Sequence, residues 1–283
     1  MEIYMPSPDL APEGPRPRVS RKKWAASPVM LWITTPLLLL VFLGIWKAYT
    51  LLFDVSSLML PPPEQVGTAM IELMQGTMIY DAIQVTLYET LVGFALAAAV
   101  GIGLGIVLGK ARNLERVLSP FLVATQVVPK VAIVPLFLLW FGFGTTSKIF
   151  MAAIIAFFVM MQNTILGIRS IDPGHRDLMR VIQAPWWKRV ISLDIPSSLP
   201  YVLTGVELGI VFAITGAVVG EYLGGDEGLG ALATTMLASL RTDMLFAAVI
   251  VMTVLGFLLY AITAAIRRFA IPWHESSGRP TSL

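Results

Sequence analysis

The feature that most constrains this chain is a series of apolar stretches, each about as long as a bilayer is thick. A helix needs about 20 apolar residues to cross the hydrocarbon core of a membrane. Six stretches meet this length: 29–52, 82–109, 120–143, 148–168, 199–223 and 244–266. Only 13% of the residues are charged, against about 25% in soluble domains. The sequence therefore predicts an all-α membrane protein with six transmembrane helices, and it argues against a soluble enzyme.

The net charge and the residue composition argue against several further classes of function. The net charge is +2, so nucleic-acid binding through bulk charge has no support. The chain has no cysteine and only two histidines, His175 and His274, which argues against thiolate or His-rich metal sites. The stretch from Gly105 to Lys110 has the wrong spacing for a phosphate-binding loop and is not followed by a hydroxyl residue. We expect neither catalysis nor a nucleotide, metal or other cofactor site on this chain.

Basic residues predict the orientation of the helices. Sixteen of the 20 lie in the N-terminal tail, in the loops after the second and fourth stretches, and in the C-terminal tail. Only Lys148 and Arg241 belong to the opposite side. Because cytoplasmic loops are rich in Lys and Arg, both termini are expected to be cytoplasmic. The expected organisation is a disordered tail (1–28), a six-helix domain (29–268) whose first helix is a retained anchor, and a second tail (269–283).

The loop between the fourth and fifth stretches, residues 169–198, is long enough to have a structure of its own. Asp172 before Pro173 is typical of a helix start. Pro185 is expected to end or bend this helix, and a second amphipathic turn over 186–193 is expected to stop at Pro196. The exposed apolar residues suit a groove on a partner protein. The alternative is a helix lying among lipid headgroups.

This loop resembles the coupling segment of ABC importer permeases, with the pattern Glu-Ala-Ala, three residues, Gly, nine residues, Ile-x-Leu-Pro. The spacing matches throughout, although only Pro196 is identical. The chain from about 60 to 273 also resembles permeases of the nitrate/taurine/sulfonate type. The stretches that carry this resemblance are LPPPEQV, VPKVAIVPLFLLWFGFG, IRSIDPGHRDL, IPSSLPYVLTG and VVGEYLGGDEGLG.

The resemblance implies a MetI-like architecture in the bacterial inner membrane, and it implies partners. These are a second permease copy (most simply a homodimer), two ABC ATPase subunits that bind ATP and magnesium, and an extracytoplasmic solute-binding protein. The coupling segment would contact the ATPase. Its expected contact residues are Asp172, Asp177, Leu178, Met179, Gln183, Ala184, Pro185, Trp186 and Pro196.

Three ionisable residues, Glu89, Lys130 and Glu207, fall well inside the apolar stretches. Such residues face a bundle interior, a partner charge or a cavity. Lys130 lies between two prolines six residues apart, which predicts a loosened backbone. It could contact an anionic substrate, or it could form a structural ion pair with Glu89 or Glu207. The candidates for the translocation pathway are Glu89, Lys130, Glu207, Thr215 and Glu221. The last three are implied by the resemblance, because the fifth stretch resembles a span that lines the pathway in this family.

Two stripes of small residues predict close helix packing in preference to a pore lining. The first runs along the second apolar stretch and the second along the fifth. Their members are Gly93, Ala97, Gly101, Gly105 and Gly109, and Gly205, Gly209, Gly216 and Gly220.

The sequence thus favours the permease subunit of an ATP-driven importer for a small anionic or aromatic organic solute. Two stretches, TLYETLVGF and GEYLGG, resemble the sequences of relatives that handle vitamin precursors or aromatic carboxylates more than those of nitrate permeases. One alternative is a self-sufficient secondary transporter or channel that uses Lys130, Glu89 and Glu207 as an ion relay. Another is a membrane scaffold that transports nothing and recruits a partner through its loop.

Overall fold

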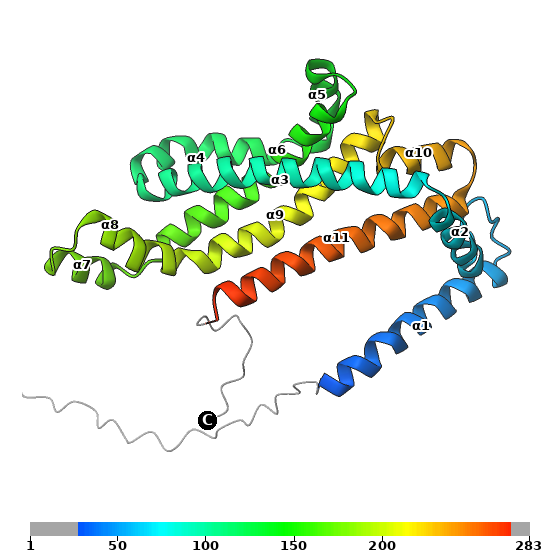
Figure 1. The fold of residues 1–283 in the computed structure, drawn as a ribbon, viewed down its shortest axis with the longest axis horizontal. Coiled ribbons are helices and arrows are strands. Elements are labelled where there is room, and N and C mark those ends of the chain that lie inside the picture. The colour runs from blue at the N-terminus through cyan, green and yellow to red at the C-terminus, as the bar shows by residue number, and fades with distance from the viewer. Residues whose placement is uncertain (1–27, 273–283) are drawn as a thin grey trace, which may run out of the picture. The chain divides into compact units, whose positions relative to one another are not determined.

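The computed structural model describes residues 28–272, which form helices joined by turns, without a strand in that range. The first helix is α1 (Pro28–Leu52), whose side chains from Ile33 onward are mostly exposed. The other long helices are α3 (Met78–Lys110), α6 (Thr145–Arg169), α9 (Ile195–Gly224) and α11 (Thr242–Ala270) (Figure 1). Five helices are long and apolar enough to span a membrane, or six if one bent pair counts as a span. The predicted tails lie almost wholly outside the described residues.

The bent pair corrects the third predicted span, which was expected as one stretch over 120–143. It consists of α4 (Arg112–Val127), the short 3-10 helix η1 (Lys130–Ile133) and α5 (Val134–Phe141). The two halves are bent by 84°. The break falls at Val128 and Pro129, both in extended conformation. Pro129 has no N–H to donate and disfavours helical geometry at the residue before it, so the helix ends there.

The two glycine stripes hold α3 and α9 close to α6. A Cβ added at Gly101 of α3 would lie 2.9 Å from the carbonyl oxygen of Phe157, and one at Gly216 of α9 would lie 2.8 Å from that of Met151. Both oxygens belong to α6, so its backbone approaches the other two helices where they carry no side chain. The packing prediction for both stripes is confirmed.

Two short helices, α2 (Pro63–Gln75) and α10 (Leu229–Ala238), lie in segments that were expected to be loops. Their buried residues form one apolar cluster with the start of α3 and with α11. Its members are Ala69, Leu73, Ile79, Ala82, Leu229, Leu232, Met244, Ala247, Ala248 and Val251. This cluster closes one end of the bundle.

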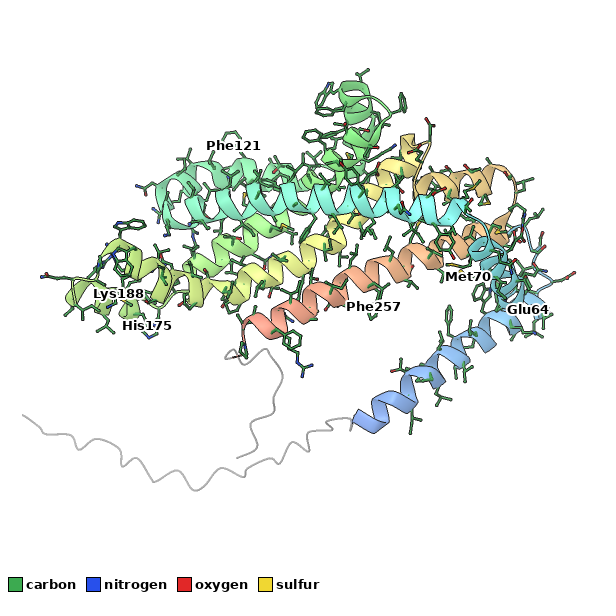
Figure 2. All side chains as sticks on the ribbon, in the orientation of Figure 1. Glu64, Met70, Phe121, His175, Lys188 and Phe257 are labelled. Atoms are coloured by element: carbon green, nitrogen blue, oxygen red, sulfur yellow. The ribbon has the colours of Figure 1, made fainter. Side chains whose placement is uncertain are left out.

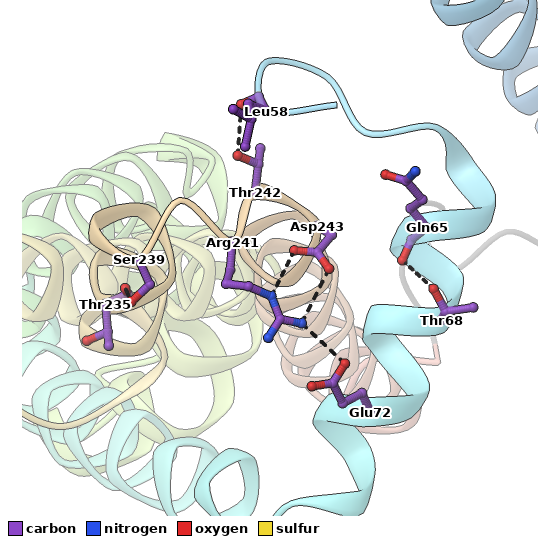
Figure 3. Close-up of polar contacts among 9 residues, drawn as sticks. All are labelled: Leu58, Gln65, Thr68, Glu72, Thr235, Ser239, Arg241, Thr242 and Asp243. Atoms are coloured by element: carbon purple, nitrogen blue, oxygen red, sulfur yellow. Dashed lines mark hydrogen bonds and ion pairs between the residues drawn. The ribbon is translucent and has the colours of Figure 1, made fainter. Parts of the chain in front are cut away.

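Polar contacts reinforce the same end (Figure 3). The Arg241 guanidinium forms ion pairs with Glu72 of α2 at 3.2 Å and with Asp243 of α11 at 3.4 Å. Hydrogen bonds to Asp243 and Glu72 raise the pKa of Arg241 above its ordinary value. The Thr242 hydroxyl donates to the carbonyl oxygen of Leu58 at 2.8 Å. Arg241, which was expected on the outer side, therefore connects α2 to α11.

A buried carboxylate fixes the start of α10. Glu221 of α9 accepts a hydrogen bond from the Gly230 N–H at 2.7 Å and one from the Thr86 hydroxyl at 2.6 Å. Thr86, on α3, accepts in turn from the Leu229 N–H at 2.9 Å. The first N–H groups of a helix have no partner within that helix, and here a carboxylate and a hydroxyl supply one. Gly228 has φ +99° and lies against the carboxylate, where a side chain would collide with it.

The glycine packing predicts that one of two neighbouring substitutions lowers the stability of the protein and that the other does not. Gly105→Ala places a Cβ 2.5 Å from that of Thr164, and such overpacking costs about 1–3 kcal/mol of stability. Gly103→Ala is the matched control, because no atom lies within 4 Å of its added Cβ. Thermal unfolding of the purified protein in detergent should show a lower melting temperature for Gly105→Ala alone. Equal shifts would contradict the close contact.

The Glu221 contacts predict a local loosening of α10. Glu221→Ala leaves the Gly230 N–H and the Thr86 hydroxyl without their acceptor, at a cost of about 2–3 kcal/mol. Limited proteolysis should cut the 225–228 turn faster in this variant. Glu221→Gln keeps one acceptor oxygen and should be intermediate. Glu227→Ala, an exposed acid in the same turn, should behave as wild type; if it is cut as fast as Glu221→Ala, the cap is not what protects the turn.

Candidate functional site

The long loop forms two short helices, as the sequence predicts. The first, α7 (Pro173–Val181), has Asp172 as its N-cap residue, and the Asp172 carboxylate accepts a hydrogen bond from the Gly174 N–H at 2.6 Å. Pro173 lies in the first turn of the helix, where a missing N–H costs nothing. The predicted N-cap is therefore confirmed.

The bend after α7 has a defined geometry. The Gln183 N–H donates to the Arg180 carbonyl at 2.9 Å, and the Ala184 N–H donates to the Met179 carbonyl at 3.0 Å. These two bonds make a Schellman motif, which places one residue in left-handed conformation. That residue is Gln183, with φ +49°. It stands where the importer pattern has glycine, which explains why a glycine suits that position.

The second helix, α8 (Trp186–Arg189), does not stop at Pro196 as expected. It continues through a π-helical turn, η2 (Val190–Asp194), into α9. The Ile195 N–H reaches back five residues to the Val190 carbonyl. Pro196 then falls in the first turn of α9, so its missing N–H does not interrupt the helix. The loop is thus joined rigidly to a membrane span.

The coupling segment, defined here as residues 172–196, presents apolar side chains outward. His175 and Lys188 lie at the end of the molecule that α7 and α8 form (Figure 2). Of the nine residues expected to contact an ATPase, Met179, Ala184 and Pro196 are half-buried and the others are exposed. The other exposed apolar side chains of the segment are Val181, Ile182, Trp187, Ile191 and Ile195.

Lys130 lies at the break between α4 and α5, beside a cavity of about 280 Å³. Its ammonium lies 5.5 Å from the centre of the Phe158 ring and 6.0 Å from that of Phe212. Such rings stabilise a cation through their π faces. The polar residues that line the cavity are Gln126, Lys130, Gln162 and Asn163.

Of the two alternatives for Lys130, the ion pair with Glu89 or Glu207 is not formed among the residues that the structure describes. Glu207 pairs with Arg267 of α11 at 2.7 Å instead. This contact joins α9 to α11 between residues 60 positions apart, which no local pattern could indicate. The Thr215 hydroxyl donates to the Val211 carbonyl of its own helix at 2.7 Å. Thr215 also lines a mostly apolar cavity of about 450 Å³ between α9 and α11.

Glu89 and Glu221 do lie together, inside the bundle, and both are fully buried. The carboxyl of Glu89 interacts with that of Glu221 and with the ammonium of Lys148. Lys148, which was expected to face outward, is only 3% exposed and donates to the Phe143 carbonyl at 2.9 Å. This role was not predictable, because Lys148 is the first residue of the predicted span 148–168, at the boundary of an apolar stretch, whereas α6 begins at Thr145. Thr86 was also missed, and nothing in the sequence distinguishes it from a packing residue.

The pathway candidates therefore fall in separate places. Lys130 borders one cavity, Thr215 another, and the two carboxylates Glu89 and Glu221 are enclosed in protein. Glu207 is held by Arg267. A continuous ion relay through Lys130, Glu89 and Glu207 is not formed, so the secondary-transporter alternative is not favoured.

Comparison with known proteins identifies the family. Residues 101–271 match the binding-protein-dependent transport system inner membrane component family. SsuC of Bacillus subtilis, named for aliphatic sulfonates transport, is 31% identical over 93% of this chain and 94% of its own. The riboflavin transport system permease protein RibX of Chloroflexus aurantiacus is 33% identical over 93% of this chain and 96% of its own.

A solved structure gives the same fold. In an inward-facing form of the MetNI methionine ABC transporter, one chain superposes with a TM-score of 0.59 at 16% identity. The match covers 71% of this chain and 97% of that one. The chain belongs to the binding-protein-dependent inner-membrane component family and is a multi-pass permease subunit of an ABC importer of the nitrate/taurine/sulfonate type.

Proposed function

We propose that this chain forms the translocation path for a small anionic or aromatic organic solute and is driven by a cytoplasmic ATPase that docks on the coupling segment. The observation that carries the proposal is the geometry of this segment. It is a defined pair of short helices, exposed and apolar, at one end of the bundle. A helix with an apolar face is a common ligand for a groove on a partner.

Movement of the docked segment would reach the membrane helices directly. The bend at Gln183 is fixed by two backbone hydrogen bonds, and α8 runs into α9 without a flexible linker. A displacement of α8 by the ATPase therefore moves α9 as one body. ATP and magnesium belong to the ATPase in this scheme.

The proposed assembly contains two copies of this chain, two ATPase subunits and a solute-binding protein that delivers the solute. A homodimer is the simplest way for one six-span chain to enclose a path, because most oligomers are symmetric. Both termini lie on the ATPase side, in the cytoplasm, which agrees with the sixteen basic residues assigned to that side.

Two lines support the solute class. The relatives named above are named for the transport of aliphatic sulfonates and of riboflavin. A sulfonate is an anionic organic solute, and riboflavin is an aromatic one. In this chain one cavity is lined by the ammonium of Lys130, by two aromatic rings and by three side-chain amides. A planar carboxylate or a sulfonate finds charge, hydrogen bonds and a stacking surface there.

The bend at Gln183 provides the test of ATPase coupling. Gln183→Gly suits φ +49° and should keep transport, whereas Gln183→Val puts a β-branched residue in a conformation it strongly disfavours. Strain of about 1–2 kcal/mol at the docking surface should reduce uptake about tenfold in the Val variant. The measurement is ATP-driven uptake by proteoliposomes that contain the chain, its ATPase and its solute-binding protein.

The same proteoliposomes separate the rival functions. Uptake that follows an ion gradient without ATP would overturn the importer assignment. Intact wild-type uptake with equal rates for Gly and Val at position 183 would remove the coupling role from this bend.

Lys130 gives a second prediction. Lys130→Gln removes the cation and should lower uptake of an anionic solute about tenfold, the effect of losing one hydrogen bond to a charged group. Lys130→Arg keeps the charge and should retain most of the uptake. ATP hydrolysis without solute should be unchanged in both, because no residue of the coupling segment lines the cavity at Lys130 and Lys130 has no ion pair among the described residues. Equal uptake by all three proteins would exclude Lys130 from the path.

A further inference from the structure

A basic cavity of about 500 Å³ lies where the coupling segment meets the ends of α3 and α6. Its walls come from five elements: the last residues of α3, the end of α6, the helices α7 and α8, and the turn η2. The charged and aromatic residues that line it are Lys110, Arg176, Arg180, Trp186, Arg189 and Asp194.

The cavity carries an excess of positive charge. Four cationic side chains face one carboxylate, Asp194, which already pairs with Lys110 at 2.9 Å. Arg176 donates to the carbonyl of Ile168 at 2.6 Å, which fixes its guanidinium at the end of α6. Arg180 pairs with the exposed Asp177 at 2.7 Å. Within residues 28–272 the side chain of Arg189 has no hydrogen-bond or ion-pair partner.

The cavity also lies at the ends of two helices that are able to span a membrane. Lys110 is the last residue of α3, and Ile168 is the residue before the last of α6. Both helices are long and apolar enough to span the bilayer, so their ends lie at or beyond the layer of lipid headgroups. Trp186 and Trp187 are exposed beside the cavity, and tryptophan is enriched at that level.

We infer that this cavity binds a phosphate group, and its place at the membrane surface points to the headgroup of an anionic phospholipid as the source. Guanidinium groups bind phosphate through paired N–H donors. Basic pockets between membrane helices are known sites for anionic headgroups. The lipid would contact α3 and the coupling segment at once, so it would hold the segment against the bundle. This site goes beyond the transport function and needs no ATPase for its test.

The test is lipid retention by the purified full-length chain in detergent, measured by native mass spectrometry. Phosphatidylglycerol should be retained over phosphatidylcholine. Arg189→Gln should weaken this retention several-fold, and Arg180→Gln with Arg189→Gln about tenfold or more, since each basic residue near an anionic surface contributes to binding. Arg189→Gln breaks no contact between described residues, so a folding defect is not expected. Arg268→Gln removes the same charge at the exposed end of α11, outside the cavity, and should retain the lipid as wild type does.

Three results would overturn the inference. Equal retention of the anionic and zwitterionic lipids would exclude recognition of the anion. Equal loss in Arg189→Gln and Arg268→Gln would indicate a general charge effect. Protection of the chain against thermal unfolding by millimolar inorganic phosphate, without retention of phosphatidylglycerol, would assign the cavity to a free anion and not to a lipid.

Discussion

The close approach of α6 to α3 and α9 is the contact on which the rest of the structure depends. Apolar side chains gain little by leaving lipid for a helix surface, so membrane helices associate mainly through van der Waals packing and interhelical hydrogen bonds. Glycines of α3 and of α9 provide that packing, because they let the backbones of these helices approach the backbone of α6. The same approach encloses Glu89, Lys148 and Glu221 in protein. Without it these three ionisable groups would face lipid.

The enclosed carboxylate of Glu221 shows how a polar residue inside a membrane protein serves the fold. It connects α3, α9 and α10 through Thr86 and Gly230. The stretch GEYLGGDEGLG thereby gains a structural meaning. Its acid binds the backbone at the start of α10, and Gly228 provides the space and the positive φ that bring that backbone to the acid.

Much of the fold follows from local patterns. Span length, the two glycine stripes, the Asp172–Pro173 helix start and the bend before Pro185 were predictable because each depends on neighbouring residues. The short helices α2 and α10 were not, since 13 and 10 residues fall below the length that a search for spans detects. Their burial depends on a cluster shared with α3 and α11.

The candidate site was predictable only in part. The coupling segment was located by its spacing, and the structure explains the glycine position of the pattern through Gln183. The partners of ionisable residues were not predictable, because only tertiary packing brings Glu207 to its ion-pair partner Arg267 and places Glu89 within the electrostatic influence of Lys148. The continuation of α8 past Pro196 depends on one irregular turn, η2, that no pattern in the sequence predicts.

That turn, η2, has a geometric consequence. A π-helical turn is equivalent to one residue inserted into an α-helix, and each residue of an α-helix advances about 100° around the axis. If the same five residues, Val190–Asp194, formed regular α-helix instead, α7 and α8 would be rotated by about that angle relative to α9. The direction in which the coupling segment points is thus set by a single residue of register, separately from the residues that line the membrane helices. In this chain the phase of one helical turn therefore decides which face of α7 and α8 is presented at the end of the bundle.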